Sequence, residues 1–271
     1  MNNRFKNKVK LEADVIRKPY NKNIIDIYEI FELSGFDNYP KIIDYDENEI
    51  RYEYIESKKI YEQIENEELI KTLAYLHSKT SKFIDVSKTK YNNIKKIIEN
   101  NINYLMKYYN DMIDDIENEI FMSPSNYLIA RNYSSILITL ENSKKLLSKW
   151  YKKVENKTNE RVSVIHNNIS LNHFIISNKN YLISFDGARV DTPILDLYKF
   201  YKKEYLNINF PLLYDIYIKN FPLLEEEELL FKTLICIPPK IVKIQNEYAD
   251  TVNISEIFKY INKTLEFINA K

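Results

Sequence analysis

Histidine, carboxylate and amide side chains gather in one short part of the chain, at positions where they could move protons or bind a metal ion. His166 and His173, two of the three histidines, bracket a polar loop, and Asp186 follows soon after. Imidazole titrates near neutral pH and is the commonest general acid or base. A His173–Asp186 pair with His166 nearby would also suit a transition metal.

Short apolar runs must position these side chains. Val162 to Ile165, Phe174 to Ile176 and Tyr181 to Ile183 are bounded by Asn, Ser and Gly. Such runs predict short buried strands joined by loops. A helix is expected to begin near Pro193, with Asp196 in its first turn.

This pattern resembles the catalytic core of the protein kinase-like phosphotransferases. The loop His166–His173 reads HNNISLNH, the strand end at 183–186 reads ISFD, and Asp196 is followed by Leu. These are similar to the His-x-Asp-x-x-x-x-Asn loop, the Ile-Asp-Phe-Asp strand end and the Asp-Leu helix start of the aminoglycoside and choline kinase superfamily. The closest likeness is to bacterial spore-coat kinase-like proteins.

The resemblance implies residue roles that this sequence does not fill. It places the catalytic base at Asn168 and the two magnesium ligands at His173 and Ser184. An amide has no useful basicity, magnesium prefers hard oxygen ligands, and a serine hydroxyl carries no charge. The resemblance also implies that His166 and Asp196 brace the loop, a structural role that outlasts activity.

The alternative is to shift the alignment of this sequence with the family motif. Asn172 would take the metal position if the loop were one residue shorter, and Asp186 would do so if the strand slid by two residues, which keeps the same face. The downstream acids favour the first alignment. Asp186, Asp191 and Asp196 follow Ser184 at the spacings found in spore-coat kinase-like proteins.

The amino-terminal part predicts a small lobe over residues 1–57. It holds one strand from Lys8 to Lys18, a helix from Ile24 to Ser34, and a hairpin over residues 41–55. The resemblance implies a phosphate-binding Arg17 or Lys18, as cofactor-binding residues together with Ser184 and Asp186. The alternative is a solvated charge on an edge strand.

Two further features, one in that helix and one in the residues before it, bear on nucleotide binding. The resemblance implies that Asp26 or Glu29 faces the lysine strand, although either is equally compatible with plain helix surface. No glycine precedes Gly35, whereas loops that cradle phosphate need glycine so that backbone N–H groups can approach the oxygens.

Residues 58–271 predict a mostly helical large lobe. Long amphipathic patterns run from Glu65 to Thr80, from Tyr91 to Phe121 and onward from Pro124, and the last helix spans 254–268. The fold class expected is therefore α+β, a two-lobed kinase-like fold. His77 is expected to be a packed side chain.

Bulk composition excludes several partners. The chain has 39 Lys plus Arg residues and 39 Asp plus Glu residues. It therefore has no net positive charge that would favour binding to nucleic acid or to a membrane surface. The single cysteine, Cys236, fits a reducing compartment and a packing role, and no apolar run predicts a transmembrane helix or a signal peptide. A cytoplasmic protein is expected.

Three functions follow. The first is a pseudokinase that binds an unknown protein or small molecule in the cleft between lobes, with no cofactor. The second is an active small-molecule phosphotransferase that uses Mg-ATP and atypical residues. The third is an unrelated helical protein whose loop resembles a kinase by chance. The loss of three chemical positions and of a glycine loop favours the first.

Overall fold

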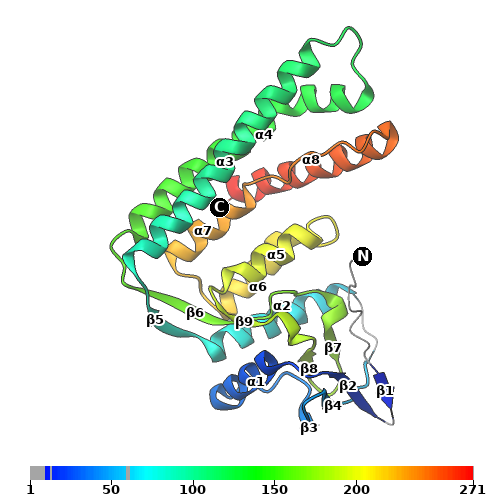
Figure 1. Cartoon of the computed structure of the whole chain (residues 1–271), viewed down its shortest axis with the longest axis vertical. Coiled ribbons are helices and arrows are strands. Elements are labelled where there is room, and N and C mark those ends of the chain that lie inside the picture. Colours follow the sequence, from blue (N-terminus) through cyan, green and yellow to red (C-terminus); the bar gives the residue numbers. More distant parts are fainter. Residues whose placement is uncertain (1–9, 13, 59–61, 271) are drawn as a thin grey trace. The chain divides into compact units, whose positions relative to one another are not determined.

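The computed structural model describes residues 10–12, 14–58 and 62–270, in a mixed α and β arrangement (Figure 1). It divides into two compact units. The first holds the described residues up to Phe83, with Arg161–Phe200 and Phe210–Pro222. The second holds Ile84–Glu160, Tyr201–Asn209 and the residues from Leu223 onward. The lobe boundary expected after residue 57 stays a prediction.

A four-stranded antiparallel sheet begins the first unit. Its strands, in the order β1-β2-β4-β3, are β1 (Lys10–Glu12), β2 (Val15–Pro19), β4 (Glu49–Glu53) and β3 (Ile42–Tyr45). The hairpin of β3 and β4 confirms the expectation for residues 41–55.

The single strand expected over Lys8–Lys18 is wrong, because the described residues form two strands, β1 and β2, which pair antiparallel. Asp14 has a φ of 64°, and Asp is one of the few side chains that tolerate this left-handed region, so the turn needs no glycine. Residues 8, 9 and 13 of the expected strand lie outside the described residues.

Helix α1 (Lys22–Ser34) follows β2 and packs one apolar face inward. The Asn21 side chain accepts a hydrogen bond from the backbone N–H of Asn23, and Gly35 ends the helix with a φ of 71°. Ile24, Ile27, Tyr28 and Phe31 are buried. Leu33 is 90% exposed, because a position two residues after Phe31 falls on the opposite face of the helix.

Further helices and short strands, most of whose residues belong to the first unit, position the loop His166–His173. Helix α2 (Glu62–Thr80) packs against α6 (Phe210–Asn220), and β7 (Phe174–Ile176) pairs with β8 (Asn180–Leu182). Strand β6 (Asn159–Ile165) pairs with β9 (Arg189–Asp191) in a sheet ordered β5-β6-β9, where β5 is Lys82–Asp85. Helix α5 (Ile194–Glu204) begins after Pro193, as expected.

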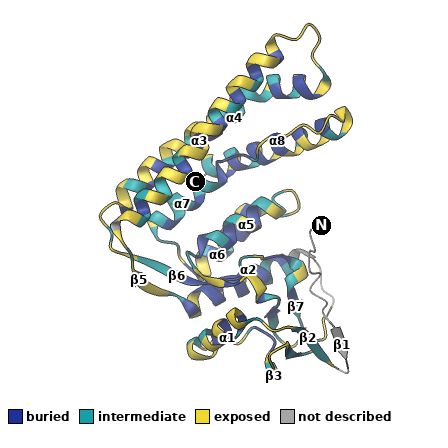
Figure 2. Cartoon of the chain, in the orientation of Figure 1, coloured by how far each residue is buried: buried dark blue, intermediate teal, exposed yellow. Residues whose placement is uncertain are grey.

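The second unit is a group of helices around α4 (Pro124–Val154). That helix packs against α3 (Lys88–Glu117), α7 (Glu225–Ile235) and α8 (Glu247–Asn269). Helices α3 and α4 run antiparallel, and their buried and exposed residues alternate at helical spacing (Figure 2). Cys236 is fully buried beside α7, and burial raises the pKa of its thiol to about 12, which agrees with packing.

Among the described residues, no helix combines the length and the apolar character needed to cross a bilayer.

Candidate functional site

A polar pocket in the first unit brings together most of the residues that the sequence singled out. Its volume is about 320 Å³. It is lined by Lys18, Pro19, Asn167, Asn168, His173, Ser184, Asp186 and Gly187. Lys18 comes from β2, Asn167 and Asn168 follow β6, and Ser184 and Asp186 follow β8, so the fold joins segments that are far apart in the sequence.

Lys18 is the cation of this pocket. Its ammonium Nζ lies 3.2 Å from Ser184 Oγ and 3.1 Å from Asp186 Oδ2, donating to both. Arg17 instead donates from Nη1 to Glu49 at 3.1 Å and lines neither this pocket nor the apolar pocket described below. Successive strand residues point to opposite faces, which corrects the expectation that gave Arg17 and Lys18 equal standing.

The acidic partner expected from α1 does not reach Lys18. Asp26 and Glu29 are both exposed. Tyr28 faces inward in their place, because it shares a helix face with Ile24 and Phe31, which pack into the core. The carboxylate that pairs with Lys18 is Asp186.

His166 lies buried beside the pocket and supports the loop. Its Nε2–H donates to the Ile183 carbonyl at 2.8 Å, and its Nδ1 accepts from the Asn168 backbone N–H at 3.3 Å. Burial lowers the pKa of His166, so the ring is neutral at neutral pH. Both nitrogens are engaged with backbone groups, which leaves none for a metal ion.

His173 is held by the same loop but faces the pocket. Its Nδ1 lies 2.8 Å from the Asn168 carbonyl oxygen, which can only accept, so Nδ1 carries the hydrogen. In the neutral ring Nε2 is then the unprotonated nitrogen. The rings of His173 and His166 stack with centroids 5.8 Å apart.

Asp196 joins the loop to two helices. Its carboxylate accepts from the backbone N–H groups of His166 at 2.7 Å and Asn167 at 2.6 Å, which fits the bracing role that the resemblance implied. It also accepts from His77 Nε2 at 3.2 Å. Burial alone would raise the pKa of Asp196, but the hydrogen bonds from the His77 side chain and the His166 backbone oppose it, and the pKa is held below its ordinary value.

His77 is packed, as expected, and has a partner that the sequence did not indicate. Its Nδ1 lies 2.6 Å from the hydroxyl of Tyr217 on α6. In the neutral ring whose Nε2 donates to Asp196, Nδ1 is the acceptor and the Tyr217 hydroxyl is the donor. No spacing pattern in the sequence links α2, α5 and α6, so this buried chain of three side chains could not be found from it.

Asn167 and Lys199 were also missed. Asn167 has a φ of 67°, and its Nδ2 donates to the Gly187 carbonyl at 2.9 Å. The Lys199 ammonium donates to the Asn167 side-chain oxygen and, at 3.3 Å, to its carbonyl. These bonds fix the turn directly after His166, and only the tolerance of Asn for left-handed backbone hinted at it.

A transition-metal site is not assembled at His173 and Asp186. In the part of the chain that the structure describes, no three His, Cys, Asp or Glu side chains converge as metal ligands. His166, the expected third member, is occupied by Ile183 and Asn168 as described above.

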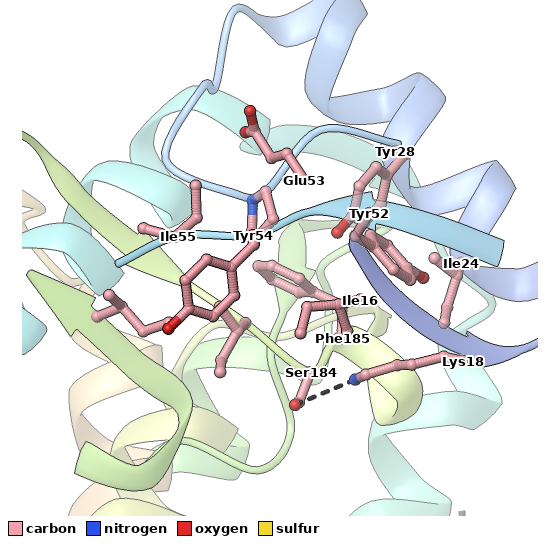
Figure 3. A pocket seen from close by; sticks show the side chains of 13 residues that line it. Ile16, Lys18, Ile24, Tyr28, Tyr52, Glu53, Tyr54, Ile55, Ser184 and Phe185 are labelled. Atoms are coloured by element: carbon pink, nitrogen blue, oxygen red, sulfur yellow. Dashed lines mark hydrogen bonds between the residues drawn. The ribbon is translucent and has the colours of Figure 1, made fainter. Parts of the chain in front are cut away.

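A second, apolar pocket of about 200 Å³ adjoins the Lys18–Ser184 contact (Figure 3). Aromatic and aliphatic side chains form most of its wall. They are Ile16, Ile24, Tyr28, Tyr52, Tyr54, Ile55, Ile175, Ile183 and Phe185, together with Pro40, Glu53, Lys18 and Ser184. Burial and the nearby Asp186 charge raise the pKa of Tyr52 well above its ordinary value. Ile55, which follows β4, also contributes to this wall.

The sequence matches no model of a protein family and no curated protein. The structure resembles an aminoglycoside phosphotransferase from Alicyclobacillus acidocaldarius subsp. acidocaldarius at 9% identity and a TM-score of 0.62, over 97% of this chain and 89% of that one. It also resembles the AMP-bound complex of a spectinomycin phosphotransferase at 16% identity and a TM-score of 0.51, over 96% and 89% of the chains.

These likenesses extend along nearly the whole chain. The expected α+β kinase-like fold is therefore confirmed, and the alternative of a helical protein with a different fold is wrong. The chain has the protein kinase-like fold of the aminoglycoside phosphotransferases.

Proposed function

We propose that this chain is a pseudokinase, a kinase-like protein that binds a ligand but does not transfer phosphate. The observation that carries the proposal is the side-chain chemistry of the polar pocket. An amide, an imidazole and a hydroxyl stand at Asn168, His173 and Ser184, and the one carboxylate among the described lining residues, Asp186, is paired with Lys18.

Phosphoryl transfer needs a metal clamp and a group that orients or deprotonates the acceptor. Loss of a general base alone costs a rate factor of about 10²–10⁴. The Ser184 hydroxyl is uncharged and already accepts a hydrogen bond from the Lys18 ammonium. It is therefore a weak ligand for a divalent ion. The turn between β1 and β2 also has no glycine that could cradle phosphate.

Transfer of radiolabelled phosphate from Mg-ATP to aminoglycosides, choline and sugars tests the proposal. The wild-type protein is expected to give no transfer above a no-protein blank. The variant Asn168→Asp/His173→Asn/Ser184→Asp is the matched comparison, because it restores the chemistry that the resemblance implies. Asp tolerates the left-handed φ of 64° at Ser184, so the change fits the backbone. Wild-type transfer to any of these acceptors would contradict the proposal.

An active phosphotransferase is the second candidate, and one observation favours it. His173 and Asp186 both line the polar pocket, and the Nδ1 hydrogen bond of His173 leaves Nε2 as a possible base. If transfer is found, His173→Gln must abolish it for this candidate to hold. Transfer that survives this change would show that His173 is not the base.

The proposed ligand is a small molecule in the apolar pocket, or a segment of a protein that reaches it, and no nucleic acid, membrane or cofactor is involved. The spectinomycin phosphotransferase neighbour binds AMP, which supports small-molecule binding by this fold. We further propose a cytoplasmic location and a relationship to spore-coat kinase-like proteins. Localisation of a fluorescent fusion in growing and sporulating cells tests both.

A further inference from the structure

We propose that the loop joining α3 and α4 is a docking site for a basic, amphipathic segment of another protein. Ile120, Phe121 and Met122 form an apolar tip on this loop, and exposed acids of α3 precede it. All of these residues belong to the second unit. The inference therefore concerns a different surface from the ligand site of the proposed function and does not depend on it.

The apolar tip exposes side chains that folding leaves without a partner. Ile120 is 90% exposed and Phe121 is 89% exposed, and Met122 and, near the start of α4, Tyr127 are exposed as well. Figure 2 shows the loop between α3 and α4 largely in the colour of exposed residues. Single apolar side chains are common on protein surfaces, but an exposed run of three is typical of a surface that binds something.

The apolar surface continues onto the start of α8. The Glu247 carboxylate accepts hydrogen bonds from the backbone N–H and, at 3.0 Å, from the hydroxyl of Ser125, which holds the start of α8 beside the start of α4. Ile244 and Tyr248, just before and just after Glu247, are 68% and 82% exposed. A partner can therefore contact apolar side chains from two segments of the chain.

The acids beside the apolar tip set the charge of the partner. Residues 108–130 contain no lysine or arginine, and the last two turns of α3 expose Asp111, Asp114, Asp115 and Glu117. The ion pairs of the second unit that the structure describes all involve other acids. Like charges three or four residues apart on a helix repel each other, so approaching lysine or arginine side chains would relieve this repulsion.

Nearby groups of the chain do not neutralise these four acids. At the same end of the unit, Asn126 Nδ2 donates to both carboxylate oxygens of Glu119, at 2.7 and 2.8 Å, and the Lys243 ammonium donates to Asn126 Oδ1. Within the residues that the structure describes, no three acids, histidines or cysteines converge as metal ligands. The four acids span about 9 Å of helix, which matches an extended basic segment better than a single ion.

A basic amphipathic segment satisfies both features of this surface. Its apolar side would cover the tip, while its lysine or arginine side chains would face the acids of α3. An anionic lipid surface also accepts apolar side chains, but its headgroups would be repelled by the same acids. The charge of α3 thus favours a protein partner over a membrane.

Fluorescence anisotropy with a labelled amphipathic peptide of leucine and lysine, about five helical turns long, tests the inference with the full chain in low salt. The wild type should bind it at least about tenfold more tightly than two variants. One removes the charge, Asp111→Asn/Asp114→Asn/Asp115→Asn/Glu117→Gln, and the other removes the tip, Ile120→Ser/Phe121→Ser/Met122→Ser. Added salt should weaken binding by the wild type more than binding by the charge variant.

The matched control removes four other exposed acids of the second unit that make no described ion pair, in the variant Glu141→Gln/Glu155→Gln/Glu256→Gln/Glu266→Gln. It should bind the peptide within about twofold of the wild type. An equal loss in this control, full binding by the tip variant, or no binding by the wild type would overturn the inference. Phe121→Ser alone gives the same comparison if the triple variant does not fold.

Two further measurements distinguish the other occupants of the tip. Vesicles of phosphatidylcholine and phosphatidylglycerol should not sediment the wild-type protein, and analytical ultracentrifugation should show the same oligomeric state for the wild type and the tip variant. Vesicle binding that the tip variant loses would assign the surface to a membrane and overturn the inference. A dimer that the tip variant loses would assign it to a second copy of this chain and overturn it equally.

Discussion

At the scale of single residues, the loop His166–His173 keeps the residues that hold its backbone in place. It lacks the residue types that phosphoryl transfer requires. His166 and Asp196 make the backbone hydrogen bonds expected of loop supports. Asn168, His173 and Ser184, which face the pocket, carry none of the charge that a magnesium ion needs. Replacing a polar side chain that lines a pocket changes the stability of the fold little. Removing a buried acceptor destabilises the fold, because it leaves buried N–H donors without a partner.

Asp196→Ala tests the structural role of that buried carboxylate. The backbone N–H groups of His166 and Asn167, together with His77, lose their acceptor in a fully buried place. Unfolding free energy from urea denaturation should fall by about 1–3 kcal/mol. Asp26→Ala, on the exposed side of α1, should change it by no more than about 0.5 kcal/mol. Equal stability of the Asp196 variant and the wild type would refute the role.

His166 should make stability fall in mild acid. The folded state lowers its pKa from the ordinary 6.5, so below that pH the unfolded chain binds more protons than the folded one. Stability is therefore full above pH 6.5 and decreases as the pH drops below it. The slope is at most about 1.4 kcal/mol per pH unit for one proton.

His166→Gln should flatten this dependence between pH 6.5 and about 5, since its amide keeps a donor and an acceptor but does not titrate. Urea denaturation across the range measures it. Gly35→Ala is the control, because it lowers stability without changing a titratable group. A slope in His166→Gln as steep as in that control would exclude His166 as the cause.

At the scale of elements, most helices and strands could be predicted, because their signals are local. Helix α1 has its apolar spacing and Gly35, and α4 has Ser123 and Pro124 at its start. The β1–β2 hairpin was missed because its turn uses Asp14 at a left-handed φ and has no glycine.

Gly35→Ala tests how α1 ends. The residue has a φ of 71°, and an added Cβ would meet no atom within 4 Å, so only the backbone conformation resists the change. Unfolding free energy should fall by about 1–2 kcal/mol. Gly187→Ala is the matched control, because its Cβ would make an ordinary 3.5 Å contact with Asn167 Nδ2 and its backbone is not left-handed. A larger loss at Gly187 than at Gly35 would contradict this interpretation.

At the scale of the whole molecule, the site depends on segments that the sequence could not bring together. The resemblance placed Lys18, Asn168 and Ser184 in one site, and all three line the polar pocket. It could not tell Lys18 from Arg17, nor show that Asp186 pairs with the cation, because both depend on strand facing and loop conformation. The apolar pocket was also invisible, since Tyr28 and Tyr52 read as ordinary core residues.

Thermal unfolding with ATP, with and without magnesium, tests most directly the claim that this kinase-like fold does not use Mg-ATP. A ligand that binds only the folded state adds RT ln(1 + [L]/Kd), so micromolar affinity at millimolar ATP would add about 4 kcal/mol. Wild-type Tm should be the same with ATP in magnesium and in EDTA, while the Asn168→Asp/His173→Asn/Ser184→Asp variant should gain a magnesium-dependent rise. A clear magnesium-dependent rise in the wild-type protein would contradict the account.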